Sequence, residues 1–243
     1  MAELEMWSLK PAQFTLAEGE VHIWRAYLNC EEKTLQQFET TLSPEEIARA
    51  NRFLSSRDRN SFVSTRGILR ELLGKYTNCR AADVAITYGN YGKPSLCSTN
   101  PKQSVQFNIS HSHGLVLLAF AIDRVLGVDL ELVREGFVGE EIAERYFSSQ
   151  EVNELKALPP HLRTEGFFLC WTRKEAYVKA RGKGLEIPLK SFSVSLTPGQ
   201  PEHLWSEDQS RWCLHSLCPG ARYVGAFVAE GKEAQIRSLD WKP

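Results

Sequence analysis

The order of hydrophobic and polar residues along the chain predicts a mixture of short strands and longer helices. Residues 21–28 (VHIWRAYL) alternate between the two types and are rich in aromatic side chains, which is typical of a strand. Residues 114–122 (GLVLLAFAI) are apolar throughout, as expected of a buried strand. Short strands are predicted over residues 21–28, 83–89, 105–110, 114–122, 126–133, 192–196, 211–217 and 223–230.

Helix start and stop signals separate these strands. Ser43 is a suitable N-cap, Pro44 suits the first helical position and Glu46 completes a capping box, so a helix is predicted from residue 44. A second helix is predicted over about 58–73, with Gly74 as its C-terminal stop. Further helices are predicted over residues 137–147, from Ser148 or Ser149 to about 158, and over a long segment that ends near Gly182.

Strands and helices occur in both halves of the chain, which predicts the α+β class with two related halves. The composition of residues 95–104 (SLCSTNPKQS) is typical of a linker. We therefore expect an N-terminal lobe over residues 1–104 and a C-terminal lobe over 105–243.

Composition narrows the class of protein. Hydrophobic residues make up 42% of the 243 residues, charged residues 24%, and the formal net charge is −1, so no overall charge favours nucleic acid or an anionic membrane. The six cysteines include no CxxC pair, which argues against structural zinc. The segment MAELEMWSLK lacks a targeting pattern and no apolar stretch could span a bilayer, so we expect a cytoplasmic protein.

The segment GVDLE (127–131) places two acids on one face of a strand. A turn is expected at Gly127, and the side chains that follow point to alternate sides, so Asp129 and Glu131 share a face. One interpretation is a solvated face of a half-buried strand. The other is that a metal ion binds between the two carboxylates.

The segment WTRKEAYVKARGKG (171–184) adds a third acid. Trp171, Glu175 and Lys179 are four residues apart and share a helical face, and Lys174 adds a basic group beside Glu175. A surface Glu–Lys pair is the simpler interpretation. Alternatively, Glu175 joins Asp129 and Glu131 as an all-oxygen ligand set, which would favour Mg²⁺ or Mn²⁺ over zinc.

The segment FNISHSHG (107–114) offers a further candidate. Ser110 and His111 are adjacent near a strand end, where they could bind a phosphate or form a polar turn; His113 is expected in the turn itself. They indicate a hydrolase triad only weakly, because no GxSxG elbow is present. The chain also lacks a Walker loop and a GxGxxG motif, which argues against mononucleotide kinases and Rossmann enzymes.

Basic residues gather in the first half of the chain. Most arginines on the predicted helices over residues 44–73 are expected on a solvated face, although some could form a local anion patch. Residues 90–95 (NYGKPS) are expected to form a turn that presents Lys93.

Together, YGKP with FNISHS, GVDLE and WTRKEAYVKARGKGL, in this order, resemble the 4'-phosphopantetheinyl transferases of the larger, surfactin-synthetase-activating (Sfp-like) type. The resemblance covers roughly residues 45–228. It implies two similar lobes related by a pseudo-twofold axis, each a small, mainly antiparallel sheet with helices, and coenzyme A bound between them. It also implies transfer of phosphopantetheine from coenzyme A to a serine of an acyl, peptidyl or polyketide carrier protein, with Mg²⁺ required.

The resemblance further implies a role for each matching residue. The Mg²⁺ ligands would be Asp129, Glu131 and Glu175, with Glu175 also the candidate general base and Lys179 the group that stabilises the departing bisphosphate. Coenzyme A would be bound by Arg52, Arg66, Lys93, Ser110, His111 and Lys174. His113 departs from the family pattern, in which glycine is common at this position. A monomer is expected by analogy with the family.

Two rival functions remain at this stage. A non-catalytic module that binds coenzyme A or a carrier protein would keep the fold, but it would be expected to lose some of the acids or Lys179. A different Mg²⁺-dependent phosphotransferase or phosphodiesterase could use the same acids.

Overall fold

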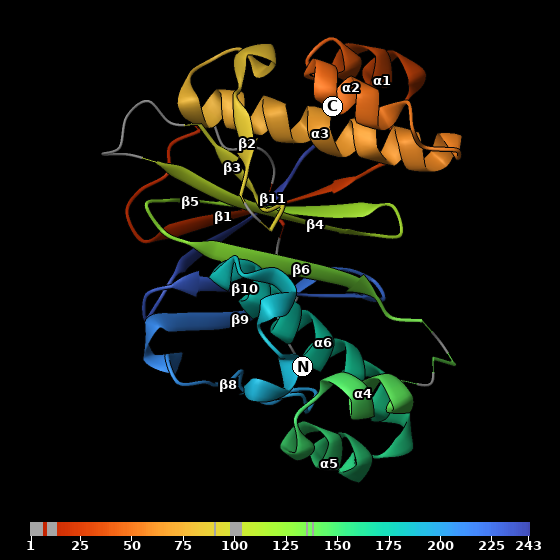
Figure 1. Ribbon diagram of the computed structural model, residues 1–243, viewed down its shortest axis with the longest axis vertical. Helices are drawn as coiled ribbons and strands as arrows, with labels where there is room; N and C mark the ends of the chain where they lie inside the picture. The colour runs from red at the N-terminus through yellow and green to blue at the C-terminus, as the bar shows by residue number, and fades with distance from the viewer. Residues whose placement is uncertain (1–6, 9–13, 90, 98–103, 135, 138) are drawn as a thin grey trace.

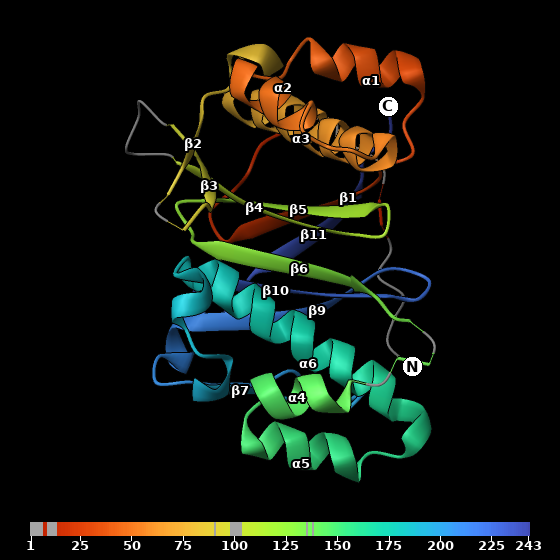
Figure 2. The ribbon, with the colours of Figure 1, turned by 45° about the vertical axis from the view of Figure 1, so that its right-hand side comes forward.

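Two β-sheets lie against each other in the middle of the molecule, and helices cover the outer face of each (Figures 1 and 2). The computed structural model describes residues 7–8, 14–89, 91–97, 104–134, 136–137 and 139–243. The strand orders are β11-β1-β5-β4 and β6-β10-β9, antiparallel except for the parallel β1–β11 pair. The bounds are β1 Glu20–Tyr27, β4 Val105–Ser112, β5 Leu115–Ile122, β6 Leu126–Leu132, β9 Trp212–Gly220, β10 Tyr223–Glu230 and β11 Gln235–Asp240.

Three helices cover the first sheet and complete what we call the first lobe. They are α1 (Glu32–Glu39), α2 (Pro44–Ala50) and α3 (Ser56–Thr77). The capping box predicted at the start of α2 is confirmed: the Glu46 amide donates to the Ser43 hydroxyl and the Ser43 amide donates to the Glu46 carboxylate. The prediction that Gly74 ends the next helix is wrong, because α3 continues to Thr77 and Asn78 caps it with a φ of 53°.

The second lobe consists of the second sheet and three helices, α4 (Glu140–Tyr146), α5 (Ser149–Ala157) and α6 (Pro160–Arg181). Ser148 is the N-cap of α5, and Gly182 caps α6 in the left-handed conformation, as predicted. Like α3, α6 has 22 residues and lies across its sheet (Figure 2). In the described part of the chain, no helix has the length and apolar character needed to cross a membrane.

The position of β5 explains why its sequence is apolar on both faces. Leu115, Leu117 and two alanines pack toward the second sheet, whereas Val116, Leu118 and Phe120 pack toward α3. The strand is therefore enclosed between a sheet and a helix layer, and neither face meets water. The connection from β4 to β5 is a tight turn in which His113 and Gly114 have φ angles of 46° and 87°, confirming that His113 lies in the turn.

Strand pairing divides the chain later than the linker composition suggests. Strands β4 and β5, which fall in the expected C-terminal lobe of residues 105–243, pair with β1 in the first sheet. The sheets separate between β5 and β6, and β11 returns to the first sheet. The composition of residues 95–104 is a local property, and it does not indicate which distant strands pair. Residues 98–103 of that segment lie outside the described residues.

Gly127 lies inside β6 and not at a turn. A Cβ at this position would overlap the main chain of α6 at Ala176 and Ala180. The change of direction before β6 occurs instead at Asp123, whose φ is 47°. Gly127 thus allows α6 to pack directly on the strand that carries Asp129 and Glu131.

Four short strands complete the structure. The strand predicted over residues 83–89 is shorter than expected and forms β2 (Ile86–Tyr88). It pairs with β3 (Pro94–Leu96), which begins within the turn predicted over residues 90–95, and the two strands form a small hairpin. The predicted strand over 192–196 is reduced to β7 (Ser193–Val194), which pairs with β8 (Leu204–Trp205). The sequence patterns missed α1 and β11; α1 has only eight residues, of which Leu35 and Phe38 are buried.

Candidate functional site

The site lies where the edge strands β4 and β6 of the two sheets meet. Side chains of β4 take the place of a main-chain ladder: Asn108 Oδ1 accepts from the Val128 amide at 2.9 Å, and Ser112 Oγ accepts from the Leu132 amide at 3.3 Å. Asn108, Ser110 and Ser112 therefore share the face of β4 that joins it to β6. The serine hydroxyls at this junction bind the two acids of GVDLE.

Asp129 is the centre of this junction. Its Oδ1 atom accepts from Lys179 Nζ at 2.6 Å and from Ser110 Oγ at 2.8 Å, and Lys179 Nζ also donates to Ser110 Oγ and to the Val128 carbonyl. The other carboxylate oxygen, Oδ2, is buried and has no hydrogen-bond partner. The sequence-based prediction that Asp129 faces away from Val128 and Leu130 is confirmed, because those two side chains pack between the sheets.

Glu131 and Glu175 lie within electrostatic reach of Asp129. Burial, followed by repulsion from Asp129, raises the pKa of the Glu131 carboxyl, while the hydroxyl of Ser112 at 3.0 Å opposes this shift. Burial and repulsion from Asp129 also raise the pKa of Glu175, and Lys179 partly offsets them. Lys179 pairs with Asp129 across the junction, and it does not form an i,i+4 ion pair with Glu175.

These acids have the donor set expected for a hard cation. Asp129 Oδ2 is a buried oxygen with no partner, and the two glutamates repel it, so a cation would relieve an excess of negative charge. Within the described ranges, no group of three or more His, Cys, Asp or Glu side chains is already arranged as a metal site. The oxygen donors thus suit Mg²⁺ in their chemistry but not in the arrangement that the structure shows, in which Lys179 supplies the positive charge at Asp129.

Lys93 reaches this junction from the β2–β3 connection. Its Nζ atom donates to the carbonyl of Leu126 at 3.0 Å and to the carbonyl of Lys179 at 2.8 Å. Burial lowers the pKa of Lys93 to about 8. Lys93 thus lies beside Glu175 and Lys179, with its ammonium engaged by the protein main chain, and its binding of coenzyme A stays a prediction.

Lys174 does not lie at the site. Its side chain is 0% exposed, and Nζ pairs with Glu151 at 2.8 Å and donates to the carbonyls of Leu189 and Phe192. Neighbouring residues of a helix are about 100° apart around its axis, so Glu175 can face the junction while Lys174 faces the core. In this structure Lys174 cannot reach a phosphate at the junction, and the role implied for it by resemblance is corrected to a structural one.

Ser110 and His111 point to opposite sides of β4. Ser110 faces Asp129, whereas His111 lines a cavity of about 620 Å³ beneath the helices of the first lobe. Partial burial and Lys179 lower the pKa of His111. The separation excludes a Ser–His pair acting on one proton, and it places the two residues against different parts of any ligand.

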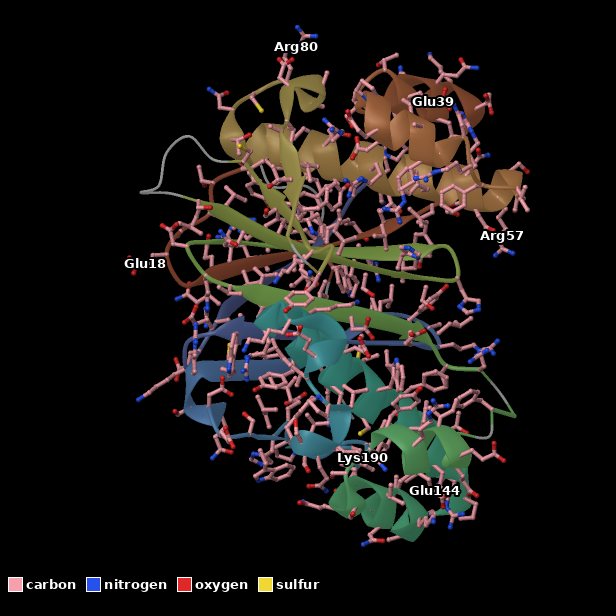
Figure 3. All side chains as sticks on the ribbon, in the orientation of Figure 1. Glu18, Glu39, Arg57, Arg80, Glu144 and Lys190 are labelled. Carbon is pink, nitrogen blue, oxygen red and sulfur yellow. The ribbon has the colours of Figure 1, made fainter. Side chains whose placement is uncertain are left out.

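The cavity beside His111 is basic. Its lining includes Arg49, Arg57 and Arg66, with Asp58 as the acid among them. Arg66 is tied to Glu46 at 2.6 Å and to the Tyr88 hydroxyl, whereas Arg57 is exposed at the start of α3 (Figure 3). The sequence predicts only that several arginines lie on helices. It does not predict that Arg49 and Arg57 line this cavity.

Arg52 faces a different hollow. It is exposed and lines a cavity of about 490 Å³ between α2, α3 and β2, which Arg49 also borders. The structure therefore does not bring Arg52 together with Arg66 and His111. Helical spacing alone could not decide which arginine faces which cavity.

Two smaller hollows open on either side of the acids. One, of about 310 Å³, is lined by Lys93, Ile109, Glu175 and Lys179, and Ile109 also borders the basic cavity. The other, of about 160 Å³, is mainly apolar and is bordered by Glu131. It is lined by Glu131, Arg134, Phe137, Ile142, Phe167, Phe168 and Trp171.

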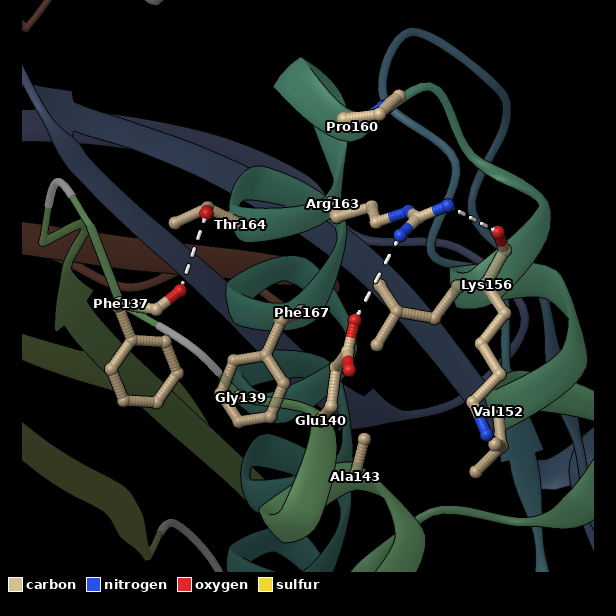
Figure 4. Close-up of a pocket in the computed structure, with 11 residues that line it drawn as sticks. Phe137, Gly139, Glu140, Ala143, Val152, Lys156, Pro160, Arg163, Thr164 and Phe167 are labelled. Carbon is tan, nitrogen blue, oxygen red and sulfur yellow. Dashed lines mark hydrogen bonds and ion pairs between the residues drawn. The ribbon is translucent and has the colours of Figure 1, made fainter.

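A further hollow, of about 230 Å³, lies between α4, α5 and the start of α6 (Figure 4). Arg163 borders it, but its guanidinium donates to the carbonyls of Leu158 and Lys156 at 3.0 and 2.9 Å. The arginine thus caps the end of α5. None of the acids at the β4–β6 junction lines this hollow.

Comparison with known proteins identifies the family. Residues 125–228 match a family model described as the 4'-phosphopantetheinyl transferase superfamily, and residues 27–122 match one described as 4'-phosphopantetheinyl transferase, N-terminal. The chain is 39% identical over 237 residues to the 4'-phosphopantetheinyl transferase HetI of Nostoc sp., covering 98% of this chain and 96% of that one. The chain belongs to the 4'-phosphopantetheinyl transferase superfamily.

A further relative supports the same assignment, and one solved structure is similar to part of the chain. The 4'-phosphopantetheinyl transferase Sfp of Bacillus subtilis is 32% identical over 66% of this chain and 69% of its own length. A solved holo-(acyl-carrier-protein) synthase from Bacillus anthracis, in complex with CoA (3',5'-ADP), matches 45% of this chain and 98% of its own at 24% identity, with a TM-score of 0.39. The two family models meet between β5 and β6, where the transferase passes from its first sheet to its second.

Proposed function

We propose that this transferase moves the 4'-phosphopantetheine group of coenzyme A onto a serine hydroxyl of an apo carrier protein, leaving adenosine 3',5'-bisphosphate. The observation that carries the proposal is the charged junction at Asp129. Two further acids and Lys179 surround Asp129, and the junction lies between a basic cavity and an apolar hollow. Transfer at a pyrophosphate needs such charge neutralisation and alignment more than covalent help from the protein.

The hollows suggest how coenzyme A is oriented. The basic cavity with Arg49, Arg57 and His111 suits the phosphorylated ribose, and Ile109 joins this cavity to the hollow that contains Glu175 and Lys179. We infer that the pyrophosphate lies beside Lys179 and Ser110, whose polar atoms already converge on one point. Arg66 borders the basic cavity, so it would support the phosphate from the α3 side.

The chemistry of the acids suits a bound Mg²⁺ or Mn²⁺ ion, with Asp129, Glu131 and Glu175 as ligands. When bound, the ion would neutralise charge on the pyrophosphate oxygens. Lys179 would stabilise the departing bisphosphate. We propose Glu175 as the group that takes the proton of the attacking serine, with Glu131 as the alternative, because burial raises the pKa of both carboxyls toward the range of a general base.

The second substrate is proposed to be an acyl, peptidyl or polyketide carrier protein. The apolar hollow beside Glu131 is bordered by Phe137, Trp171 and Arg134, and it would accept apolar surface close to the reacting groups. We further propose that the enzyme acts as a monomer in the cytoplasm. These proposals go beyond membership of the family, because they name the class of the second substrate, the oligomeric state and the location of the enzyme.

The test is to incubate the protein with Mg²⁺, coenzyme A and an apo carrier protein and to weigh the carrier by mass spectrometry. We expect the carrier to gain one phosphopantetheine group, and chelation of the metal to abolish the gain. Asp129→Ala should lower turnover at least about 100-fold while leaving the circular dichroism spectrum unchanged.

Three outcomes would contradict the proposal. Binding of coenzyme A and carrier without a mass gain would indicate a non-catalytic module. Consumption of coenzyme A without labelling of the carrier would indicate a phosphodiesterase. Near-normal labelling by Asp129→Ala would exclude the junction as the site.

A further inference from the structure

The last turn of α6 is held by a lysine from the other lobe. The helix ends at Arg181, so the carbonyl of Lys179 lies among those that a helix leaves without an internal partner. Lys93 Nζ donates to this carbonyl and also to the carbonyl of Leu126, the first residue of β6. One ammonium group therefore joins three segments: the β2–β3 connection, α6 and β6.

These are the elements that carry the reacting groups. Strand β6 supplies Asp129, and α6 supplies Glu175 and Lys179. Gly127 lets the main chain of α6 approach β6 at Ala176 and Ala180, next to the carbonyl that Lys93 binds. Lys179 is consequently fixed at both ends, by Lys93 at its main chain and by Asp129 and Ser110 at its side chain.

We propose that Lys93 is a positioning residue that holds Lys179 and Glu175 in register with Asp129, and that its ammonium does not pair with a substrate phosphate. The inference rests on the proposed function, and it assigns this side chain a different role from the one implied by resemblance. A cation at the C-terminal end of a helix is also favoured by the helix dipole. The lowered pKa of Lys93, which burial causes, agrees with an ammonium enclosed by protein.

The experiment compares Lys93→Met with wild type and with the control Lys33→Met, which changes an exposed lysine of α1. Four quantities are measured: kcat, KM for coenzyme A at saturating carrier protein, Kd for adenosine 3',5'-bisphosphate by calorimetry, and hydrogen exchange of residues 176–182. For Lys93→Met we expect kcat to fall by about 10- to 100-fold, because small displacements of reacting groups have effects of this size. KM and Kd should change less than about threefold, and exchange in the last turn of α6 should accelerate.

Lys93→Gln provides a second variant in case Lys93→Met folds poorly. The glutamine amide keeps N–H donors for a carbonyl but carries no charge for a phosphate, so a positioning role predicts a smaller loss of kcat than in Lys93→Met, with KM unchanged. A rise of about tenfold in KM and Kd with kcat preserved, in either variant, would overturn the proposal. So would wild-type kcat in Lys93→Met.

The two proposals can fail separately. If wild type and Lys33→Met both fail to label the carrier, the proposed function is wrong. The nucleotide Kd and the exchange rate of α6 still test the contact of Lys93 with the helix, because neither measurement requires turnover.

Discussion

At the residue scale, the site depends on which way neighbouring side chains point. Lys174 and Glu175 are adjacent in sequence, yet the first pairs with Glu151 in the core and the second faces the β4–β6 junction. Ser110 and His111 are adjacent as well, and β4 directs them to opposite sides. Residues that are neighbours in a sequence motif therefore need not share a site, because the backbone points their side chains in different directions.

The position of Glu175 costs stability. Its carboxyl is half-buried beside Asp129 and Glu131, and burial and repulsion raise its pKa. We predict that Glu175→Gln lowers turnover about 100-fold or more, and that it raises the free energy of unfolding by up to about 1 kcal/mol in the presence of a chelator. Urea unfolding and carrier labelling measure the two effects.

The matched control is Glu165→Gln, which changes an exposed acid on the same helix and should alter neither quantity appreciably. If Glu175→Gln raised the free energy of unfolding no more than Glu165→Gln does, repulsion among the acids would be shown to be unimportant.

Glu46 makes the stability of the first lobe depend on pH. Burial alone would raise the pKa of Glu46, but the Ser43 amide and the guanidinium groups of Arg66 and Arg70 outweigh it, and the pKa is lowered. The stabilisation is therefore complete above the unfolded pKa of about 4.3 and is lost as pH falls through the lower folded pKa. We predict that Glu46→Gln costs about 3 kcal/mol at pH 7 and progressively less toward pH 3. A difference in unfolding free energy that stays constant across this range would contradict the assignment.

At the element scale, close packing of α6 on β6 determines the geometry of the junction. Gly127 removes the side chain that would separate the two elements, and Asp129 and Lys179 can then meet at 2.6 Å. The same contact gives Lys93 access to the carbonyls of both elements.

We predict that Gly127→Ala destabilises the protein by about 3 kcal/mol and reduces labelling of the carrier, because the new methyl group would overlap the helix main chain. Urea unfolding measures the first effect. Gly89→Ala is the control: its Cβ would meet the Lys93 carbonyl at 3.8 Å, an ordinary contact, and it should cost less than about 1 kcal/mol. Similar losses in the two variants would contradict the packing argument.

At the scale of the whole molecule, the first lobe is built from two distant parts of the sequence. After β10 the chain leaves the second sheet, β11 pairs in parallel with β1, and Leu239 and Trp241 pack in the core of the first lobe. Asp240 pairs with Arg25 at 2.6 Å. The first lobe thus depends on residues from the far end of the sequence.

We predict that removal of residues 235–243 destabilises the protein by more than about 5 kcal/mol, which is comparable with the total stability of a domain. Soluble yield and circular dichroism measure the outcome. Removal of the exposed residues 242–243 alone should have little effect. A folded protein that lacks β11 would show that the parallel pair is dispensable.

The sequence by itself determined most of the elements, the shared face of the acids in GVDLE and the family. Alternation, capping signals and apolar runs predicted most strands and helices, because these depend on local contacts. The capping box at Ser43 and the shared face of Asp129 and Glu131 are examples, and both are confirmed. The motifs also indicated the family, which the comparisons confirm.

The tertiary structure alone decided how these elements pair and which basic groups reach the acids. The pairing of β5 with β1, and of β11 with β1, links residues up to 215 positions apart, and no local pattern encodes it. Three of the four lysines in the motifs make different contacts: Lys179 binds Asp129, Lys93 binds two carbonyls and Lys174 is buried with Glu151. Their charge is the same, but only packing sets the distance and the dielectric surroundings that give each a different role.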